Sequence, residues 1–218
     1  MAFRKKDKCN SIKSVVERNT GMTIAEFMRE ERKPHIDNLE ETAYLIQGYI
    51  VNSPDPDVTV IGDYDCDGDT STAIMYWTLK GLGVTPKLRI PKRFSEGYGM
   101  SVKIIDEMPD TNGLIITVDN GISSYDAVKR AKEKGYTVVI TDHHLPPKDE
   151  KGSLILPPAD IILDPHVYPE KSEFEDYCGA GLAYRLSQEL LPDTNLIQLL
   201  VLASIGTVSD VVPLVGAN

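Results

Sequence analysis

The sequence has few cysteines and no long hydrophobic run. Its 218 residues include only three cysteines, Cys9, Cys66 and Cys178, which are widely spaced and form no CxxC pair. This argues against a disulfide-stabilised scaffold and against a structural zinc site. No apolar stretch reaches the ~18 residues that a membrane-spanning helix needs, and no apolar segment follows the basic start MAFRKKDKC as it would in a secretory signal. We therefore expect a protein of the reducing cytoplasm that does not associate with membranes.

Basic residues are also in short supply. The chain has 23 Lys and Arg against 33 Asp and Glu, a formal net charge of −10. A nucleic-acid-binding protein usually has a basic surplus, so composition alone argues against that class. The objection weakens if many of the acids hold cations. The 41% hydrophobic content is typical of a globular domain of ordinary size.

The first part of the chain, residues 1 to about 56, is expected to form a helical lead-in. Thr23 and Glu26 have capping-box spacing ahead of an apolar stretch. A second helix is expected from about Asp37, because apolar residues recur on one helical face: Leu39, Ala43, Ile46 and Ile50. The tract SPDPD (53–57) breaks regular structure and indicates a boundary.

From residue 57 onward, short β-rich runs alternate with helical patterns. Five strands are expected, at 58–62, 86–90, 114–118, 137–141 and 160–163. Helices are expected at 70–80, from Ser123 or Ser124 to about Gly135, and near 181–191 and 195–205. This alternation predicts an α/β fold with an open, mostly parallel five-stranded sheet flanked by helices. The corresponding domain is 57–218.

Acidic residues follow four of these strands. They are Asp63, Asp65, Asp67 and Asp69 after the first strand, Asp119 after 114–118, Asp142 with His143 and His144 after 137–141, and Asp164 with His166 after 160–163. In an open α/β sheet, ligands bind in the crevice at the carboxyl ends of the strands, so these side chains should converge. So many carboxylates in one crevice would repel one another without cations. Carboxylate and imidazole ligands suit Mn²⁺, Mg²⁺ or Zn²⁺, and two ions that share a carboxylate are the usual apparatus of phosphoryl transfer.

Structural explanations compete for several of these residues. An Asp after a strand is often a turn residue or a helix N-cap, and for Asp164 both readings stay open. Strand-like alternation would point Cys66 away from the acids, and His35 is assigned to the lead-in with no role in the site. The run D-x-D-x-D-G resembles the start of an EF-hand loop, but its twelfth position is Ile74 and not Glu. An aspartyl-phosphate phosphatase would not explain the adjacent histidines.

Six segments together resemble a known enzyme family. GDYDCDGDTSTA (62–73), VDNG (118–121), TDHH (141–144) and GTVSDVVPL (206–214) are similar to the successive motifs of the DHH phosphoesterases. IPKRFSEGYG (90–99) and CGAGLAYRL (178–186) further resemble the RecJ branch, which contains single-strand exonucleases. The likeness covers about residues 57 to 214, in the family's order and spacing.

The resemblance implies a site with two ions, Mn²⁺ or Mg²⁺. The implied ligands are Asp65, Asp67, Asp119, His143 and Asp210, with Asp119 bridging the two ions. Asp63 and Asp142 would be supporting carboxylates. His144 would contact the scissile phosphate or assist proton transfer.

Candidate substrate-binding residues surround this set. Arg89, Arg93 and Tyr98 belong to a basic segment that would bind phosphates and stack a base, or would be an ordinary solvated loop. Gly179 and Gly181 would offer backbone N–H groups to a phosphate, or would serve helix packing. His166 is grouped with them because it lies at the same sheet edge.

Two departures from the family pattern qualify the resemblance. Some members carry a His two residues before the first acid, where this chain has Ile61, which predicts fewer protein ligands at one ion and argues against a pyrophosphatase. Family members also continue into a second domain, whereas this sequence stops at Asn218, so that domain is expected to be absent.

The function implied is hydrolysis of single-stranded DNA from the 5′ end, releasing mononucleotides, in DNA repair or recombination. Two alternatives stay open: a phosphodiesterase of short oligonucleotides or cyclic dinucleotides, and a non-catalytic scaffold related to RecJ.

Overall fold

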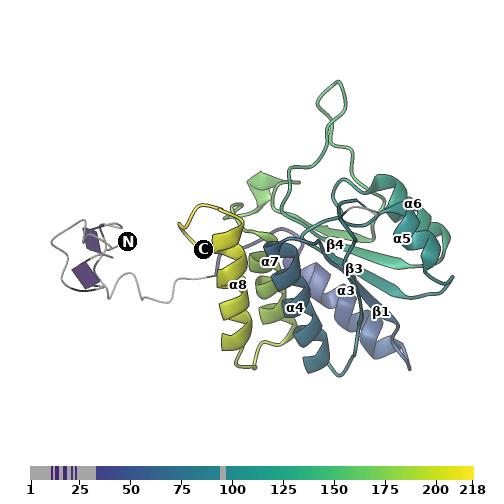
Figure 1. Cartoon of the computed structure of the whole chain (residues 1–218), viewed down its shortest axis with the longest axis horizontal. Helices are drawn as coiled ribbons and strands as arrows, with labels where there is room; N and C mark the ends of the chain where they lie inside the picture. Colours follow the sequence, from purple (N-terminus) through teal and green to yellow (C-terminus); the bar gives the residue numbers. More distant parts are fainter. Residues whose placement is uncertain are drawn as a thin grey trace. The chain divides into compact units, whose positions relative to one another are not determined.

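The computed structural model describes residues 33–93 and 97–218, together with residues 11, 13, 14, 17, 18, 21 and 23 (Figure 1). The chain divides into two compact units, Met1–Lys33 and Pro34–Asn218. Glu26 and most of the helix expected around it lie outside the described residues. The account below concerns the second unit.

The second unit contains one five-stranded sheet in which every neighbouring pair of strands is parallel. The strands are β1 (Val58–Ile61), β2 (Lys87–Arg89), β3 (Leu114–Val118), β4 (Thr137–Thr141) and β5 (Ile161–Leu163), in the order β2-β1-β3-β4-β5. The α/β class and all five strands were predicted correctly from the sequence. From β1 the chain moves to β2 on one side, and it then returns to β3 on the other. β1 and β3 therefore flank the topological switch point, where ligands bind in sheets of this order.

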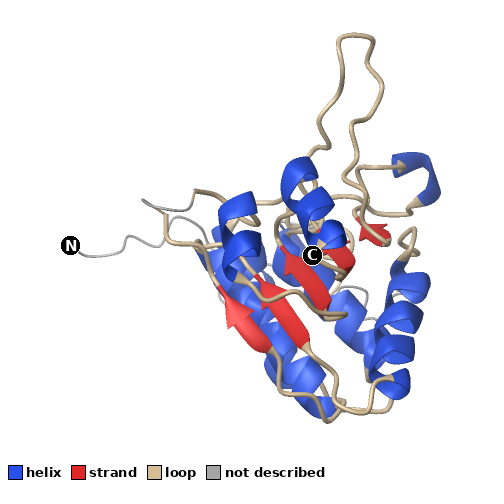
Figure 2. Cartoon of the chain, turned by 90° about the vertical axis from the view of Figure 1, so that its right-hand side faces the viewer, coloured by secondary structure: helices blue, strands red, loops and turns tan. Residues whose placement is uncertain are grey.

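Helices cover both faces of the sheet (Figure 2). On one side lie α3 (Leu39–Asn52), α4 (Cys66–Gly81) and α7 (Gly179–Leu190), with α8 (Ile197–Ser209) packed against α4 and α7. On the other side lie α5 (Val102–Glu107) and α6 (Tyr125–Glu133). A short 3₁₀ turn, η1 (Pro169–Lys171), precedes α7. The opposite placement of α4 and α6 follows from right-handed crossovers that run in opposite directions along the sheet.

Strand alternation divides the core between these two faces. Leu114 and Ile116 of β3 pack on the side of α3, α4 and α7, whereas Ile115 packs with α5 and α6. In β4, Val139 faces the first side and Val138 the second. Strands buried on both faces read as continuous apolar runs, which explains why the sequence pattern was unambiguous.

The helix bounds differ from expectation in several places. α4 begins at Cys66 and not at residue 70, so the acidic run after β1 is partly helical and the alternation argument for Cys66 was wrong; Cys66 is exposed on the first turn. α5 was not predicted, because its six residues are too few to show a periodic pattern. α3 packs against α7 and β5 within the second unit, which begins at Pro34. None of the helices in the described part of the chain is long and apolar enough to span a membrane.

Candidate metal centre

Two of the acids lie between the end of β1 and the first turn of α4. Asp65 is the N-cap of the helix, and its Oδ1 accepts a hydrogen bond of 2.9 Å from the Gly68 N–H. Asp63 lies just before it and is 1% exposed. Gly68 is required here, because a β-carbon at this position would lie 2.6 Å from the Asp63 carbonyl oxygen. The close approach brings the end of β1 against the start of α4.

Asp67 is held by the N-terminus of α7. Its Oδ2 accepts a hydrogen bond of 2.6 Å from Gly179 N–H, and its Oδ1 accepts one of 2.9 Å from Ala180 N–H. The positive end of the helix dipole stabilises the carboxylate in the same place. Gly181 N–H caps the helix on Cys178 Sγ at 3.3 Å. The expectation that Gly179 and Gly181 offer free N–H groups to a phosphate is therefore not supported, since both groups have partners within the chain.

Asp119 follows β3 with a left-handed backbone, at φ 61°. Asn120 holds this turn: its amide donates to the carbonyl oxygens of Ile61 (3.0 Å) and Val118 (2.8 Å), and its Oδ1 accepts from Met100 N–H (3.0 Å). The turn directs the buried Asp119 carboxylate toward the switch point. Asn120 thus ties β1, β3 and the segment before α5 together beneath the carboxylate.

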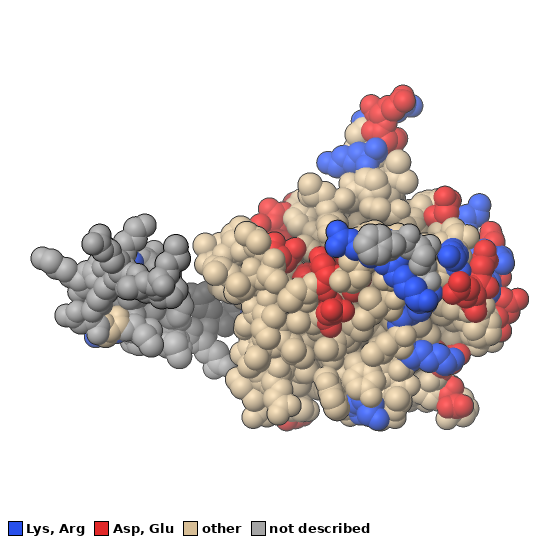
Figure 3. Space-filling view, in the orientation of Figure 1, with Lys and Arg blue, Asp and Glu red and all other residues tan. Residues whose placement is uncertain are grey.

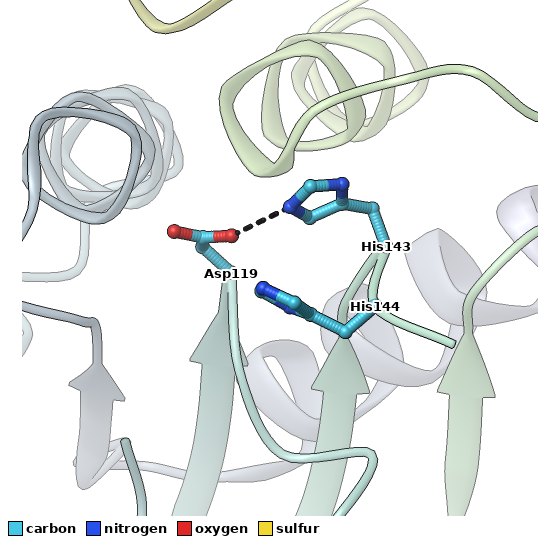
Figure 4. A group of neighbouring side chains, drawn as sticks. All are labelled: Asp119, His143 and His144. Carbon is cyan, nitrogen blue, oxygen red and sulfur yellow. Dashed lines mark ion pairs between the residues drawn. The ribbon is translucent and has the colours of Figure 1, made fainter. Parts of the chain in front are cut away.

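His143 faces three of these carboxylates. Its Nε2 lies 3.1 Å from Asp119 Oδ1, 3.7 Å from Asp210 Oδ2 and 3.8 Å from Asp67 Oδ2. Asp210 reaches the group from the C-cap of α8. Figure 4 shows Asp119 at the end of β3, with the rings of His143 and His144 directed toward it from the end of β4. Among the residues that the structure describes, two sets that share His143 have ligand atoms close enough together to hold an ion: Asp119 with His143 and His144, and Asp67 with His143 and Asp210.

The Asp142 carboxylate supports this arrangement from behind. Its Oδ1 accepts hydrogen bonds from the His143 and His144 N–H groups, and it lies 2.7 Å from His144 Nδ1. Its Oδ2 accepts from Ile122 N–H at 2.9 Å. The pairing with Asp142 raises the pKa of His144. Tyr98 also contacts His144 and the backbone of Asp119: its hydroxyl donates a hydrogen bond to the Asp119 carbonyl oxygen and lies 3.1 Å from His144 Nε2.

The electrostatics of the centre suit cations. Burial raises the pKa of the Asp119 carboxyl well above its ordinary value, and the neighbouring Asp67 raises it further. Burial also raises the pKa of Asp63 and of Asp210. Asp119 Oδ1, Asp63 Oδ2 and His143 Nε2 are buried without a hydrogen-bond partner. Unsatisfied buried acceptors and mutually repelling carboxylates are the features that a bound divalent cation would compensate.

The basic segment is placed only partly at this centre. Arg89 forms an ion pair with Glu107 at 3.1 Å, so its partner is a residue of α5 and not one of the carboxylates of the candidate metal centre. The guanidinium of Arg93 lies over the Tyr64 ring at 5.3 Å, and Tyr64 meets Tyr98 edge to face at 6.3 Å. Figure 3 shows basic side chains beside a group of acidic ones on the face drawn. Arg93, Tyr64 and Tyr98 therefore form a continuous aromatic and cationic path to His144.

The geometry can be compared with known proteins. The family model for the N-terminal domain of the DHH family matches residues 57–207. The chain belongs to the DHH family. The match spans the acids after β1, β3 and β4, so the centre lies within the matched part of this DHH chain except for Asp210, which follows it by three residues.

The similar proteins described next are longer than this DHH chain. The chain is 39% identical to the single-stranded-DNA-specific exonuclease RecJ of Haemophilus influenzae over 191 residues, covering 78% of this chain and 30% of that protein. It is 40% identical to RecJ of Bacillus subtilis over 165 residues, covering 74% and 20%. A crystal structure of exonuclease RecJ bound to manganese superposes with a TM-score of 0.73 and 32% identity, covering 84% of this chain and 46% of that one. The chain thus spans 20–30% of the length of these curated relatives.

Three contributors to the centre were not singled out from the sequence. Asn120 and Tyr64 lie inside motifs whose acids attracted attention, so adjacency was the available signal. Gly206 packs so close to Asp67 that a β-carbon would lie 2.6 Å from its Oδ1. No local pattern reveals that contact, because it depends on how α8 packs beside α4.

Proposed function

We propose that this chain is the catalytic core of a metal-dependent nuclease that hydrolyses phosphodiester bonds in single-stranded DNA. Two divalent cations, Mn²⁺ or Mg²⁺, would be held by Asp65, Asp67, Asp119, His143 and Asp210. The catalytic domain would begin at residue 57, where the family match begins, and α3 of the predicted lead-in belongs to the same compact unit, which starts at Pro34.

One observation carries this proposal. The buried His143 Nε2 faces Asp67, Asp119 and Asp210 within 3.1–3.8 Å and has no hydrogen-bond partner. An imidazole nitrogen among carboxylates offers a ligand set for Mn²⁺ or Zn²⁺, whereas a purely structural histidine would be hydrogen-bonded.

The chain's own residues divide the work around the ions. When bound, the cations supply Lewis acidity and a water of lowered pKa. Asp119 belongs to one of the two candidate ligand sets and lies 3.1 Å from the Nε2 of His143, which both sets share, and its carboxylate would bridge the two ions. Asp142 fixes the ring of His144, whose 45% exposed side chain can contact the scissile phosphate or hold a proton. Asp63 Oδ1 accepts a hydrogen bond of 3.3 Å from the N–H of Gly99, next to Tyr98.

The substrate follows from the surroundings and from the relatives. Arg93 would bind a phosphate, while Tyr64 and Tyr98 offer aromatic surface on which a base can stack. The relatives named RecJ support single-stranded DNA as substrate, and we extend this to digestion from the 5′ end with release of mononucleotides, in repair or recombination. We further propose the cytoplasm as the location of such an enzyme.

The test is hydrolysis by the purified chain with Mn²⁺. Substrates are 5′-labelled single-stranded DNA, the matching duplex, a dinucleotide and pyrophosphate. Asp119→Ala removes the bridging ligand and is expected to lower the rate by at least about 10³-fold. Asp193→Ala is the matched control, because Asp193 is exposed in the loop between α7 and α8, at the opposite end of both helices from the centre.

Each outcome decides between the alternatives. Release of mononucleotides from the single strand alone, lost in Asp119→Ala and retained in Asp193→Ala, supports the proposal. Cleavage of the dinucleotide alone indicates a small-substrate phosphodiesterase. No cleavage together with no stoichiometric Mn²⁺ binding in calorimetry indicates a non-catalytic scaffold. Equal rates for Asp119→Ala and the unmodified chain would overturn the two-ion assignment.

A further inference from the structure

The ends of β4 and β5 are both followed by an Asp–x–His motif. Asp142 and His144 follow β4, and Asp164 and His166 follow β5. Thr141 pairs with Leu163 in the parallel register, so the two aspartates occupy equivalent positions on adjacent strands. Adjacent strands lie about 4.8 Å apart, so the Asp164–His166 motif is a near neighbour of the Asp142–His144 motif.

The two Asp–x–His motifs also have similar hydrogen bonds and contacts. In each, the aspartate Oδ1 accepts a hydrogen bond from the N–H of the histidine two residues later, at 3.2 Å for His144 and 2.9 Å for His166. In each, the same oxygen faces the histidine Nδ1, at 2.7 Å and 3.6 Å. Pro165 occupies the position that His143 has in the Asp142–His144 motif, so the Asp164–His166 motif lacks the proposed metal-ligating imidazole. What the two share is a histidine ring oriented by a buried carboxylate.

A purely structural role does not account for the Asp164–His166 motif. Asp164 is 3% exposed, yet its Oδ2 is buried without a hydrogen-bond partner, as is His166 Nδ1. A buried carboxylate that serves only a turn would not be left unsatisfied. The His166 side chain keeps 21% of its surface exposed. Because Nδ1 is turned to Asp164, the exposed part includes the opposite edge of the ring with Nε2.

We propose that His166, positioned by Asp164, binds a phosphate of the nucleic-acid strand next to the phosphate that is cut. This rests on the proposed nuclease function and extends its site from the reacting phosphodiester to its neighbour. An imidazole N–H donated to a phosphate oxygen is a charge-assisted hydrogen bond. The nearby charged and titratable groups are Asp164, Glu175 and His143, and the Asp164 carboxylate facing its Nδ1 raises the pKa of His166.

The substrate series separates this role from catalysis. An oligonucleotide has a phosphate next to the one that is cut, whereas an unphosphorylated dinucleotide has a single phosphodiester. For His166→Ala we expect KM for a short oligothymidylate to rise about tenfold, the equivalent of one such hydrogen bond, with kcat little changed. Hydrolysis of the dinucleotide should not change. His166→Gln, which keeps an N–H donor, should recover part of the loss.

The matched control is His35→Ala. His35 is exposed, and its hydrogen bonds to Glu173 run through its own backbone groups. It should leave both substrates unaffected. An equal loss on the dinucleotide and the oligonucleotide for His166→Ala, or no loss on either, would overturn the proposal.

Failure of the proposed function can be told apart from failure of this inference. If the unmodified chain cleaves neither substrate, the nuclease proposal fails, and binding decides the role of His166. Fluorescence anisotropy with an end-labelled oligothymidylate in Mn²⁺ then compares the variants. Binding weakened about tenfold in His166→Ala and unchanged in His35→Ala supports a phosphate contact, whereas equal binding by all three proteins refutes it.

Discussion

Gly206 lies in α8 beside the first turn of α4. A β-carbon there would come within 2.5 Å of Ala180 Cβ and 2.6 Å of Asp67 Oδ1. Gly206→Ala should therefore displace Asp67 and lower hydrolysis by about 10²-fold, since a shift of about 1 Å at a reacting centre costs that much. Overpacking should also lower the free energy of unfolding by about 1–3 kcal/mol.

Gly48→Ala is the control for this variant. Gly48 also lies in a helix, α3, but no heavy atom would lie within 4 Å of its added β-carbon. Its free energy of unfolding should rise by about 0.5–1 kcal/mol through helix propensity, with unchanged activity. Urea unfolding and Mn²⁺-dependent hydrolysis measure both effects. If Gly206→Ala behaves like Gly48→Ala, α8 does not position Asp67.

The acids at the strand ends were predictable one residue at a time, because strand ends can be read from the sequence and parallel strands share an edge. Asp63, Asp119 and Asp142 were found in this way. Asp210 was found only through the family resemblance, since a C-cap of α8 has no strand to mark it. Asn120 escaped because its partners, Ile61 and Met100, come from other segments.

Among the elements, the contact between α4 and α7 determines where Asp67 meets the α7 N-terminus. Buried inside that contact, Thr78 Oγ1 and Ser187 Oγ lie 2.6 Å apart, and each also donates to a carbonyl of its own helix, that of Ile74 or Ala183. Two hydroxyl protons serve three contacts. The pair therefore gains less from its mutual hydrogen bond than its short distance suggests.

A double-mutant cycle tests this. Thr78→Val and Ser187→Ala should each lower the free energy of unfolding by about 1 kcal/mol, because each leaves the other buried hydroxyl with fewer partners. The double variant should cost less than the sum, since replacing both partners removes the unsatisfied group. The measurement is urea unfolding of all four proteins. Strict additivity would mean that the two helices are not coupled at this point.

Helix boundaries were harder to predict than strands for a physical reason. The strands are short apolar runs bounded by acids and glycines, so their limits are local. The acidic run after β1 looked like a loop, yet it starts α4, because Asp65 caps the helix and the α7 N-terminus compensates the charge of Asp67. That compensation comes from a segment more than a hundred residues away, which no local pattern contains.

On the scale of the whole molecule, the excess of negative charge has a local cause. The formal charge of −10 argued against a nucleic-acid-binding protein. Several of the acids, however, lie along one edge of the sheet, at the carboxyl ends of β1, β3, β4 and β5, among them the buried Asp63, Asp67, Asp119, Asp142 and Asp164. Cations bound there would offset this charge, and Arg93 with its neighbouring rings lies beside it. Net charge is therefore a poor guide to partners when the acids are clustered.

The same clustering makes the stability of the fold depend on metal. Without cations, Asp119 is a buried carboxylate close to Asp67, and burial disfavours its charged form. Asp119→Asn removes that charge with little change of shape, so the metal-free variant should be more stable than the unmodified chain by roughly 1–2 kcal/mol. With Mn²⁺ at about 100 times its dissociation constant, the unmodified chain should gain about 2.7 kcal/mol and the variant almost nothing. The order of stability should therefore reverse between EDTA and Mn²⁺ in thermal or urea unfolding, while Asp193→Asn should follow the unmodified chain in both. A variant that Mn²⁺ stabilises as strongly as the unmodified chain would show that Asp119 is not a ligand. A variant that is less stable in EDTA would show that the carboxylate serves the fold itself.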